Sequence, residues 1–405
     1  MFQSDEGKAL LEELLPLSSS DDDSISRDHL HCAQILRSRG PAGFGNIFST
    51  KIQDENDETH HSTDKEIFQQ LSEMMQLSRV KKTTELRDRV FAIRGALPEI
   101  IRREIKVDYN LPLKDVYTDV FTLIARKTQS LDILCEAIHF PLYRGHIDLP
   151  SWLPDWSHIP MVSSLAAQNP GKFTADGHIR AVFEFGDVRR NTIKLKAVAL
   201  GTIQNHGCAL NTGCRAKDYL RAFEGWRLEL MNFFRPMSVD TKDKAWVGKD
   251  EQLKDWIAKE EEFCQVLSLG KVSKEKCYTL FASMLRVRFP YLPLDMELKR
   301  YADGAPGLTG ADRIFLQEDF GENMMGRCFC ITREGNLGLG SGFMRRGDVV
   351  VVAMGCCTPI ILRPQGDNKD GNVVYRFVGD TYFHGFMHGE ALEGVARQWA
   401  DFLIQ

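Results

Sequence analysis

The spacing of apolar residues changes along the chain, and this change limits which folds the chain can adopt. Between Leu113 and Ile124 apolar residues recur every three or four positions, which predicts an amphipathic helix. The run from Ile193 to Val198 instead begins with strict alternation of apolar and charged residues, the pattern of a half-buried strand. Helical spacing returns at 217–269, and from Arg327 onward short β-rich runs alternate with Gly and Pro. The sequence therefore predicts an α+β fold.

We expect an N-terminal helical unit followed by a small antiparallel β barrel or sandwich with a helical insertion. Residues 1–62 include SSSDDDS and KIQDENDETHHSTD, with almost no apolar side chains, and are predicted to form a weakly ordered, linker-like segment. The helical unit is expected at 63–160, from the capping-box sequence TDKE to a Trp/Pro-rich turn. The barrel or sandwich is expected at 161–405. Two strand-rich parts would pair across an insertion at about 215–320, namely residues 172–205 and 326–388.

The charge and the distribution of apolar residues limit the partners and the location of the chain. A net charge of -5 over 405 residues, with a pI near 6.2, gives no electrostatic attraction to nucleic acid or to an anionic membrane. No stretch approaches the roughly twenty apolar residues of a spanning helix, and acidic residues follow Met1 where a secretion signal needs positive charge. The ten cysteines are too dispersed for a disulfide framework. We therefore expect a cytoplasmic protein with reduced thiols that binds neither nucleic acid nor membranes.

The familiar catalytic motifs do not match this sequence. Around Ser341 the sequence GLGSGF lacks the glycines of a nucleophile elbow, and no GxxxxGK[ST] phosphate-binding loop occurs. His384 and Glu390 could form an acid–base pair, but no nucleophile accompanies them in the sequence. Gly385 and Gly389 between them instead predict a tight bend, in which a residue with a Cβ atom would clash or need a disfavoured dihedral angle. On that interpretation His384 and Glu390 anchor backbone groups, and we expect no enzymatic activity.

Zinc is the metal that the cysteines and histidines of the sequence fit best. Cys328, Cys330 and the pair at 356–357 could join His384 or His388, because thiolates and imidazoles are preferred zinc ligands. Their spacing, however, lacks the usual two-residue loop between paired ligands. Two cysteines at alternate positions of a strand are more typical of small apolar side chains on one face. We therefore expect no metal and no cofactor.

The stretch LPSWLPDWSHIP, from Leu149 to Pro160, combines two tryptophans with three prolines. Pro154 lies between the tryptophans and disfavours a helix, so a turn that presents two large rings to a neighbouring face is expected. Buried rings would fasten the helical unit to the β unit, while an aromatic pair that binds a ligand is the alternative. The predicted ligand or partner contacts of the chain are Trp152, Asp155, Trp156, His384 and Glu390.

Three blocks of the sequence carry a more specific pattern. They are TELRDRVFAIRG at 84–95, LPSWLPDWS at 149–157, and a C-terminal set formed by GRCFCITREGNLGLG, GDVVVVAMGCCTPIILRP and YRFVGDTYFHGFMHGEAL. Together they span much of residues 84–393 and resemble the ordered blocks of fungal heterokaryon incompatibility (HET) domain proteins.

The resemblance also has a gap. The HET core of that family carries a Tyr-Trp-Gly motif and a Trp-Ile-Asp…Cys-Ile-Asn-Gln motif, and neither occurs in these 405 residues. The chain therefore resembles the region downstream of the HET core, as a truncated gene product or a natural short form, and no site residue can be transferred from the core.

The resemblance implies a role in allorecognition, in which recognition of an incompatible partner is coupled to programmed cell death. We expect a non-catalytic interaction or regulatory region with a protein partner of unknown identity. An uncharacterised enzyme with a pocket near His384 and Glu390 is the alternative.

Overall fold

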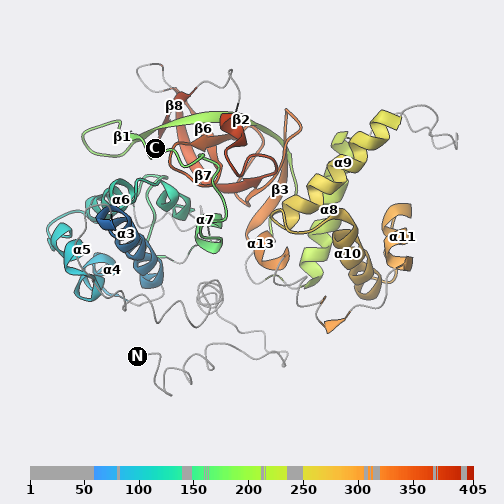
Figure 1. Cartoon of the computed structure of the whole chain (residues 1–405), viewed down its shortest axis with the longest axis horizontal. Helices are drawn as coiled ribbons and strands as arrows, with labels where there is room; N and C mark the ends of the chain where they lie inside the picture. The colour runs from blue at the N-terminus through green and yellow to red at the C-terminus, as the bar shows by residue number, and fades with distance from the viewer. Residues whose placement is uncertain are drawn as a thin grey trace.

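The computed structural model of the chain combines a helical unit, a β barrel and a group of inserted helices (Figure 1). Apart from isolated positions, it describes residues 59–79, 83–138, 148–158, 164–210, 216–234, 250–304, 320–367, 373–393 and 399–405. In Figure 1 the N-terminal helices lie on one side of the barrel and the inserted helices on the other. The predicted α+β class is confirmed. Residues 1–58, most of the predicted linker-like segment, lie outside the described residues.

The helical unit is built from short and medium helices around a single long one. Its longest helix, α3, begins at Thr59, four residues before the predicted capping box at Thr63. Helix α6 follows Pro112 and stops where Gln129 adopts the left-handed conformation, with φ at 54°. The elements of the unit are α3 (Thr59–Ser78), α4 (Asp88–Phe91), η1 (Ile93–Ala96), α5 (Glu99–Glu104), α6 (Leu113–Thr128), η2 (Asp132–Glu136) and α7 (Leu165–Gln168).

The β strands form a closed barrel. Going around it, the order is β2-β3-β4-β7-β6-β5, and the ring closes because β5 also pairs with β2. The strands are β1 (Phe183–Phe185), β2 (Ile193–His206), β3 (Arg327–Thr332), β4 (Leu337–Ser341), β5 (Val349–Ala353), β6 (Ile360–Asp367), β7 (Val373–Phe383) and β8 (Ala400–Ile404), and η5 (Glu390–Leu392) follows β7. Strand β2 pairs antiparallel with β3 and β5, so the two strand groups do pair across the insertion.

Two strands differ from the sequence prediction. In the first part of the strand-rich region expected at 172–205, residues 172–185, only Phe183–Phe185 forms a strand, β1, which pairs with the start of β2. Strand β8 lies beyond the predicted limit at residue 388 and pairs antiparallel with the start of β2 and parallel with the start of β7. Strand β8 therefore joins two strands of the barrel near one of its ends.

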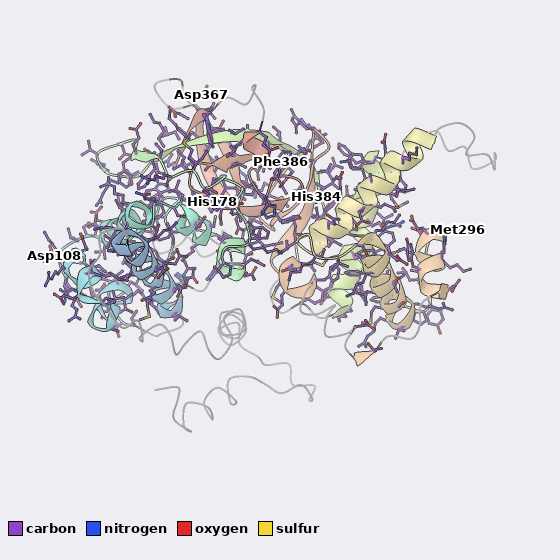
Figure 2. The ribbon with its side chains drawn as sticks, viewed as in Figure 1. Asp108, His178, Met296, Asp367, His384 and Phe386 are labelled. Atoms are coloured by element: carbon purple, nitrogen blue, oxygen red, sulfur yellow. The ribbon has the colours of Figure 1, made fainter. Side chains whose placement is uncertain are left out.

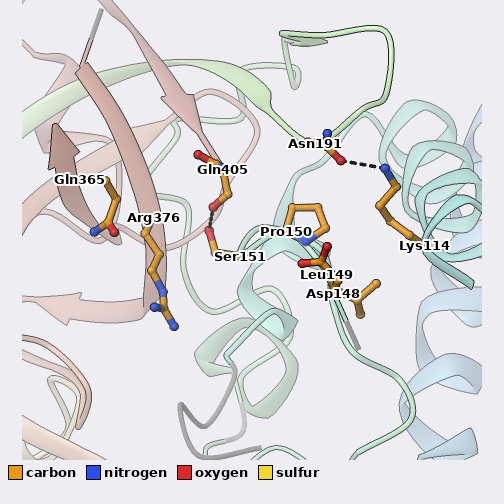
Figure 3. Close-up of a pocket in the computed structure, with 9 residues that line it drawn as sticks. All are labelled: Lys114, Asp148, Leu149, Pro150, Ser151, Asn191, Gln365, Arg376 and Gln405. Carbon is orange, nitrogen blue, oxygen red and sulfur yellow. Dashed lines mark hydrogen bonds between the residues drawn. The ribbon is translucent and has the colours of Figure 1, made fainter. Parts of the chain in front are cut away.

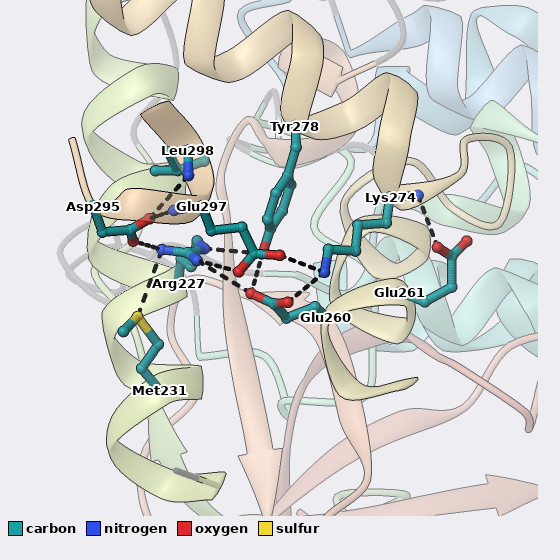
Figure 4. A network of polar contacts seen from close by, with 9 residues as sticks. All are labelled: Arg227, Met231, Glu260, Glu261, Lys274, Tyr278, Asp295, Glu297 and Leu298. Carbon is teal, nitrogen blue, oxygen red and sulfur yellow. Dashed lines mark hydrogen bonds and ion pairs between the residues drawn. The ribbon is translucent and has the colours of Figure 1, made fainter. Parts of the chain in front are cut away.

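The insertion contains α8 (Ala216–Phe234), α9 (Asp250–Leu267), α10 (Lys274–Arg288), α11 (Met296–Gly304) and α13 (Glu322–Met324). A network of charged side chains joins its first four helices (Figure 4). At its centre the Glu260 carboxylate lies 3.1 Å from the Arg227 guanidinium, 2.5 Å from the Lys274 ammonium and 3.0 Å from the Tyr278 hydroxyl. Burial raises the pKa of Glu260, and the hydrogen bond from Lys274 opposes this effect.

Two apolar cores meet at the barrel wall, and alternate residues of β5 belong to different cores. Val351 and Ala353 pack with the N-terminal helices, whereas Val350 and Val352 belong to the core that also contains the inserted helices. This division follows from the two-residue period of a strand, which sends successive side chains to opposite faces. Among the helices that the structure describes, none has both the length and the apolar character needed to cross a membrane.

Candidate functional site

The Trp/Pro-rich stretch forms turns and bends over residues 151–158 rather than a helix, as predicted. Trp152 and Trp156 are fully buried. Both rings pack edge-on against α6, with centroids 5.1 Å from Phe121 and 5.0 Å from Tyr117, respectively. Trp152 also lies 5.8 Å from the ring of Phe185 in β1. The rings therefore pack inside the core that joins the helical unit to the barrel.

The indole N–H groups of both tryptophans have partners. Trp152 Nε1 donates to the backbone carbonyl of Asn191 at 3.1 Å, and Trp156 Nε1 donates to the carboxylate of Glu136 at 3.4 Å. Buried tryptophans generally need such a partner. Because neither ring has solvent-exposed surface, both act as packing residues in this structure, and a ligand would have to displace their neighbours to reach them.

Asp155 lies between the two tryptophans in the sequence and organises the end of the turn. Its carboxylate accepts hydrogen bonds from the backbone N–H of Ser157 and from Nδ1 of His158, both at 2.9 Å. Burial would raise the pKa of Asp155, but the hydrogen bonds from His158 and Ser157 outweigh it and lower the pKa to about 2. The same hydrogen bond, opposed by burial, raises the pKa of His158. Asp155 is thus ionised and serves the local turn.

The segment from His384 to Glu390 forms a turn and a bend after β7. Figure 2 labels two of its residues, His384 and Phe386. Gly385 and Gly389 have φ angles of 75° and 91°, so the predicted need for glycine dihedral angles is confirmed. The alternative reason, a clash, is wrong for Gly385, because a Cβ atom there would meet nothing within 4 Å. Glu390 accepts from the backbone N–H of His388 at 2.6 Å, which matches its predicted anchoring role. His384 Nδ1 is buried and has no hydrogen-bond partner within the described residues.

The cysteines of the zinc candidate do not come together as a group. Cys328 and Cys330 are buried in β3, where burial raises the pKa of both thiols. Cys356 lies instead against Cys135 of the helical unit, with 3.5 Å between the two sulfur atoms. Within the part of the chain that the structure describes, no three His, Cys, Asp or Glu side chains are arranged to hold a metal ion.

A cavity of about 600 Å³ opens where the helical unit meets the barrel (Figure 3). Its lining includes Leu149, Pro150 and Ser151, which belong to the same stretch as the buried tryptophans. Its lining comes from six parts of the chain and consists of Lys114, Asp148, Leu149, Pro150, Ser151, Asn191, Gln365, Arg376 and Gln405. We refer to it as the junction cavity.

Ser151 fixes the barrel side of the junction cavity. Its buried hydroxyl accepts from the backbone N–H of Phe377 in β7 at 2.9 Å and donates to the backbone carbonyl of Gln405, next to β8. Gln405 N–H in turn donates to the carbonyl of Tyr375 at 2.8 Å. Ser151 therefore joins the Trp/Pro-rich turn to β7 and to the residue that follows β8, and these segments form the barrel side of the cavity wall.

The opposite wall is formed by α6 and the loop between β1 and β2. Lys114 Nζ donates to the backbone carbonyl of Arg189 and to the side-chain oxygen of Asn191, both at 2.7 Å (Figure 3). Arg190 has a left-handed φ of 54°, and its guanidinium forms an ion pair with Asp119 of α6 at 2.6 Å. These contacts hold the loop against α6 and fix the position of the Asn191 side chain in the cavity lining.

The junction cavity is polar and contains two cations, Lys114 and Arg376, on opposite sides (Figure 3). Asp148 is the one acidic side chain in the lining given above, and it is exposed. Sequence reasoning missed Lys114, Asn191 and Arg376, because they are far apart in the chain and each lies in an ordinary polar context. Ser151 lies within the stretch singled out from the sequence, but only the fold shows what it holds together.

Comparisons with known proteins agree with this architecture. Residues 314–404 match the Het-6 β-barrel domain. This range includes β3 to β8 but leaves out β2, which closes the ring.

The chain is also 24% identical over 359 residues to "Heterokaryon incompatibility protein 6, OR allele" of Neurospora crassa. The aligned part is 79% of this chain and 51% of that protein, so the chain spans about half the length of its relative. No solved structure matches. The barrel match and the similarity along most of the chain show that this is a protein related to the heterokaryon incompatibility proteins of fungi.

Proposed function

We propose that the chain is a non-catalytic interaction or regulatory region of a protein that acts in fungal nonself recognition and in the cell death that follows it. The similarity to a heterokaryon incompatibility protein supports a role in incompatibility. The observation that carries the proposal of an interaction role is the junction cavity, which has walls from the helical unit and from the barrel. A ligand in such a place contacts both units at once, so its binding can be sensed by the whole chain.

The contacts of Glu390 also support a non-catalytic role. Its carboxylate accepts a hydrogen bond from the backbone of His388, as a residue that stabilises a bend does. We also propose that the chain acts in the cytoplasm, because its ten cysteines are dispersed along the sequence and not grouped in a disulfide framework.

One observation favours the alternative, an enzyme with a site near His384. The buried Nδ1 atom of His384 has no hydrogen-bond partner among the described residues, and unpartnered buried groups occur at catalytic positions. The two proposals differ in the expected effect of His384→Gln. This substitution leaves an interaction region working and abolishes acid–base catalysis.

Deletion of the gene in its own fungus tests the proposed function. We expect at least one pairing that normally kills the fused cells to give viable heterokaryons in the deletion strain, scored by exclusion of a vital dye. Wild-type protein and His384→Gln should both restore cell death. An unchanged set of incompatible pairings would contradict a role in nonself recognition. Failure of a normally folded His384→Gln protein to restore death would favour the enzyme.

A further inference from the structure

We propose that the junction cavity binds an extended, acidic peptide segment of a protein partner, with Lys114 and Arg376 contacting its carboxylates. This inference rests on the proposed function, because it names the chemistry of the partner that such an interaction region would take. The segment lies between α6 and the ends of β6, β7 and β8, in contact with the helical unit on one side and the barrel on the other.

The size of the junction cavity fits a short segment of chain. Its volume of about 600 Å³ lies within the usual range of ligand pockets, roughly 300–1,000 Å³. Leu149 and Pro150 supply apolar surface, and the remaining lining residues are polar or charged. A few residues of peptide have this volume and this mixture of apolar and polar surface.

The charge of Lys114 points to an anionic ligand. Its ammonium group is half-buried and has three donors, of which two go to neutral acceptors, the carbonyl of Arg189 and the amide oxygen of Asn191. Among the ion pairs between described residues, none involves Lys114. Neutral acceptors hold the ammonium in place without cancelling its charge, so a carboxylate that reaches the third donor gains a charge-assisted hydrogen bond.

Arg376 places a second cation in the lining, on the barrel side. The acidic side chain of the lining, Asp148, is exposed. Two cations on opposite walls suit carboxylates spaced along an extended segment better than one compact anion.

The neutral polar residues of the lining suit a peptide backbone. Asn191, Gln365 and Gln405 each carry a side-chain amide, which can donate to a peptide carbonyl and accept from a peptide N–H. Asn191 is fixed by Lys114, and Gln405 is fixed through its backbone by Ser151 and Tyr375. Groups held in place before binding lose less entropy when the ligand arrives.

The test uses the whole chain and a fluorescein-labelled hexaglutamate peptide, with binding followed by fluorescence anisotropy at about 50 mM salt. We expect hexaglutamate to bind and hexaglutamine not to bind. Arg376→Gln and Lys114→Gln should each weaken binding about tenfold, the effect of one hydrogen bond to a charged group. Arg376→Lys and Lys114→Arg keep the positive charge and should retain most of the wild-type affinity for hexaglutamate. Arg346→Gln, an exposed cation outside the lining, is the matched control and should bind like wild type.

Several results overturn the inference. Hexaglutamate that binds no better than hexaglutamine, or binds equally to Arg376→Gln and Arg346→Gln, rules out the junction cavity as its site. Inorganic phosphate is titrated in parallel, and binding of phosphate without binding of hexaglutamate means that the cavity takes a small anion instead of a peptide. The melting temperature of each variant is compared with that of wild type, to show whether Lys114→Gln weakens binding by loosening the β1–β2 loop. If it does, Arg376→Gln alone decides the test.

The two proposals can fail separately. If deletion of the gene alters compatibility but an Arg376→Gln strain behaves like wild type and the peptide does not bind, the cavity inference fails and the proposed function stands. If deletion leaves compatibility unchanged, the proposed function fails whatever the peptide does.

Discussion

Trp152 occupies the centre of the contact between α6, β1 and the β1–β2 loop, so its removal tests the packing role of the turn. We expect Trp152→Ala to lower the free energy of unfolding by about 3–5 kcal/mol, because a fully buried ring is replaced by a cavity. Trp152→Phe should cost less, since it loses the hydrogen bond to Asn191 but keeps an aromatic ring. Urea denaturation followed by circular dichroism gives both values. A Trp152→Ala protein within about 0.5 kcal/mol of wild type would contradict the buried position.

Asp155 makes the stability of the turn depend on pH. Its pKa in the folded chain is about 2, below the ordinary value of 3.8, so its contribution is present above about pH 4 and is lost as the pH falls through 2. The raised pKa of His158 acts at the other end, where its contribution is complete below 6.5 and is lost as the pH rises through its higher folded value.

The measurement is the urea midpoint of unfolding between about pH 6 and pH 3, where the carboxylate of the unfolded chain titrates. We expect Asp155→Asn to show a smaller fall in midpoint than wild type. Asp367→Asn, an exposed carboxylate on β6, serves as control and should keep the wild-type fall. Equal falls in wild type and Asp155→Asn would show that the Asp155 pKa is not lowered by folding.

The burial of the two tryptophans could be predicted from the sequence, whereas the role of Ser151 could not. Large apolar rings next to prolines gain most by burial, whatever surrounds them. The partners of Ser151 lie 226 and 254 positions away along the chain, so no local pattern could indicate them. The same reason applies to Lys114 and Arg376, which line one cavity although they are far apart in the sequence.

At the scale of helices, the buried network around Glu260 is expected to stabilise the packing of the inserted helices against one another. Glu260→Gln removes the fully buried one of the two carboxylates that Arg227 and Lys274 share. Because Glu297 still pairs with both cations, we expect a loss at the lower end of the range for a broken buried ion pair, about 3 kcal/mol in the free energy of unfolding. Glu262→Gln on the same helix is the matched control, because its ion pair with Lys259 is partly exposed and worth roughly 0–1 kcal/mol. Similar thermal unfolding of the two variants would mean that the network does not hold the helices.

The prediction of elements succeeded where the pattern was local. The alternation in Ile193–His206 and the apolar runs of β3 to β7 predicted strands, because the two-residue period and the glycines between the runs can be recognised in the local sequence. Strand β8 has five residues and exists through its pairing with β2 and β7, a long-range arrangement that its own residues do not specify. Helix α3 begins at Thr59, before the predicted start, because the capping-box pattern at Thr63 lies inside the helix.

For the whole molecule, the division of β5 between two cores has a consequence for cooperativity. Val351 packs toward the N-terminal helices and Val352 toward the inserted helices, yet both belong to one strand of the closed barrel. Opening either core exposes one face of this strand. The helical unit and the insertion should therefore unfold together with the barrel rather than as separate domains.

Native-state hydrogen exchange, read by mass spectrometry, measures this coupling. We expect Val351→Ala to lower the free energy of opening by about 2 kcal/mol, from the lost methyl groups and the cavity they leave. The decrease should be equal in peptides from α6 and α10, although Val351 belongs to the apolar core that contains α6 and not to the core that contains α10. Val352→Ala is the matched variant on the opposite face of the strand and should also affect both helices equally. If the barrel couples the two cores, weakening either face of β5 must lower the free energy of opening in both helices. A decrease confined to α6 for Val351→Ala and to α10 for Val352→Ala would therefore show two independent units.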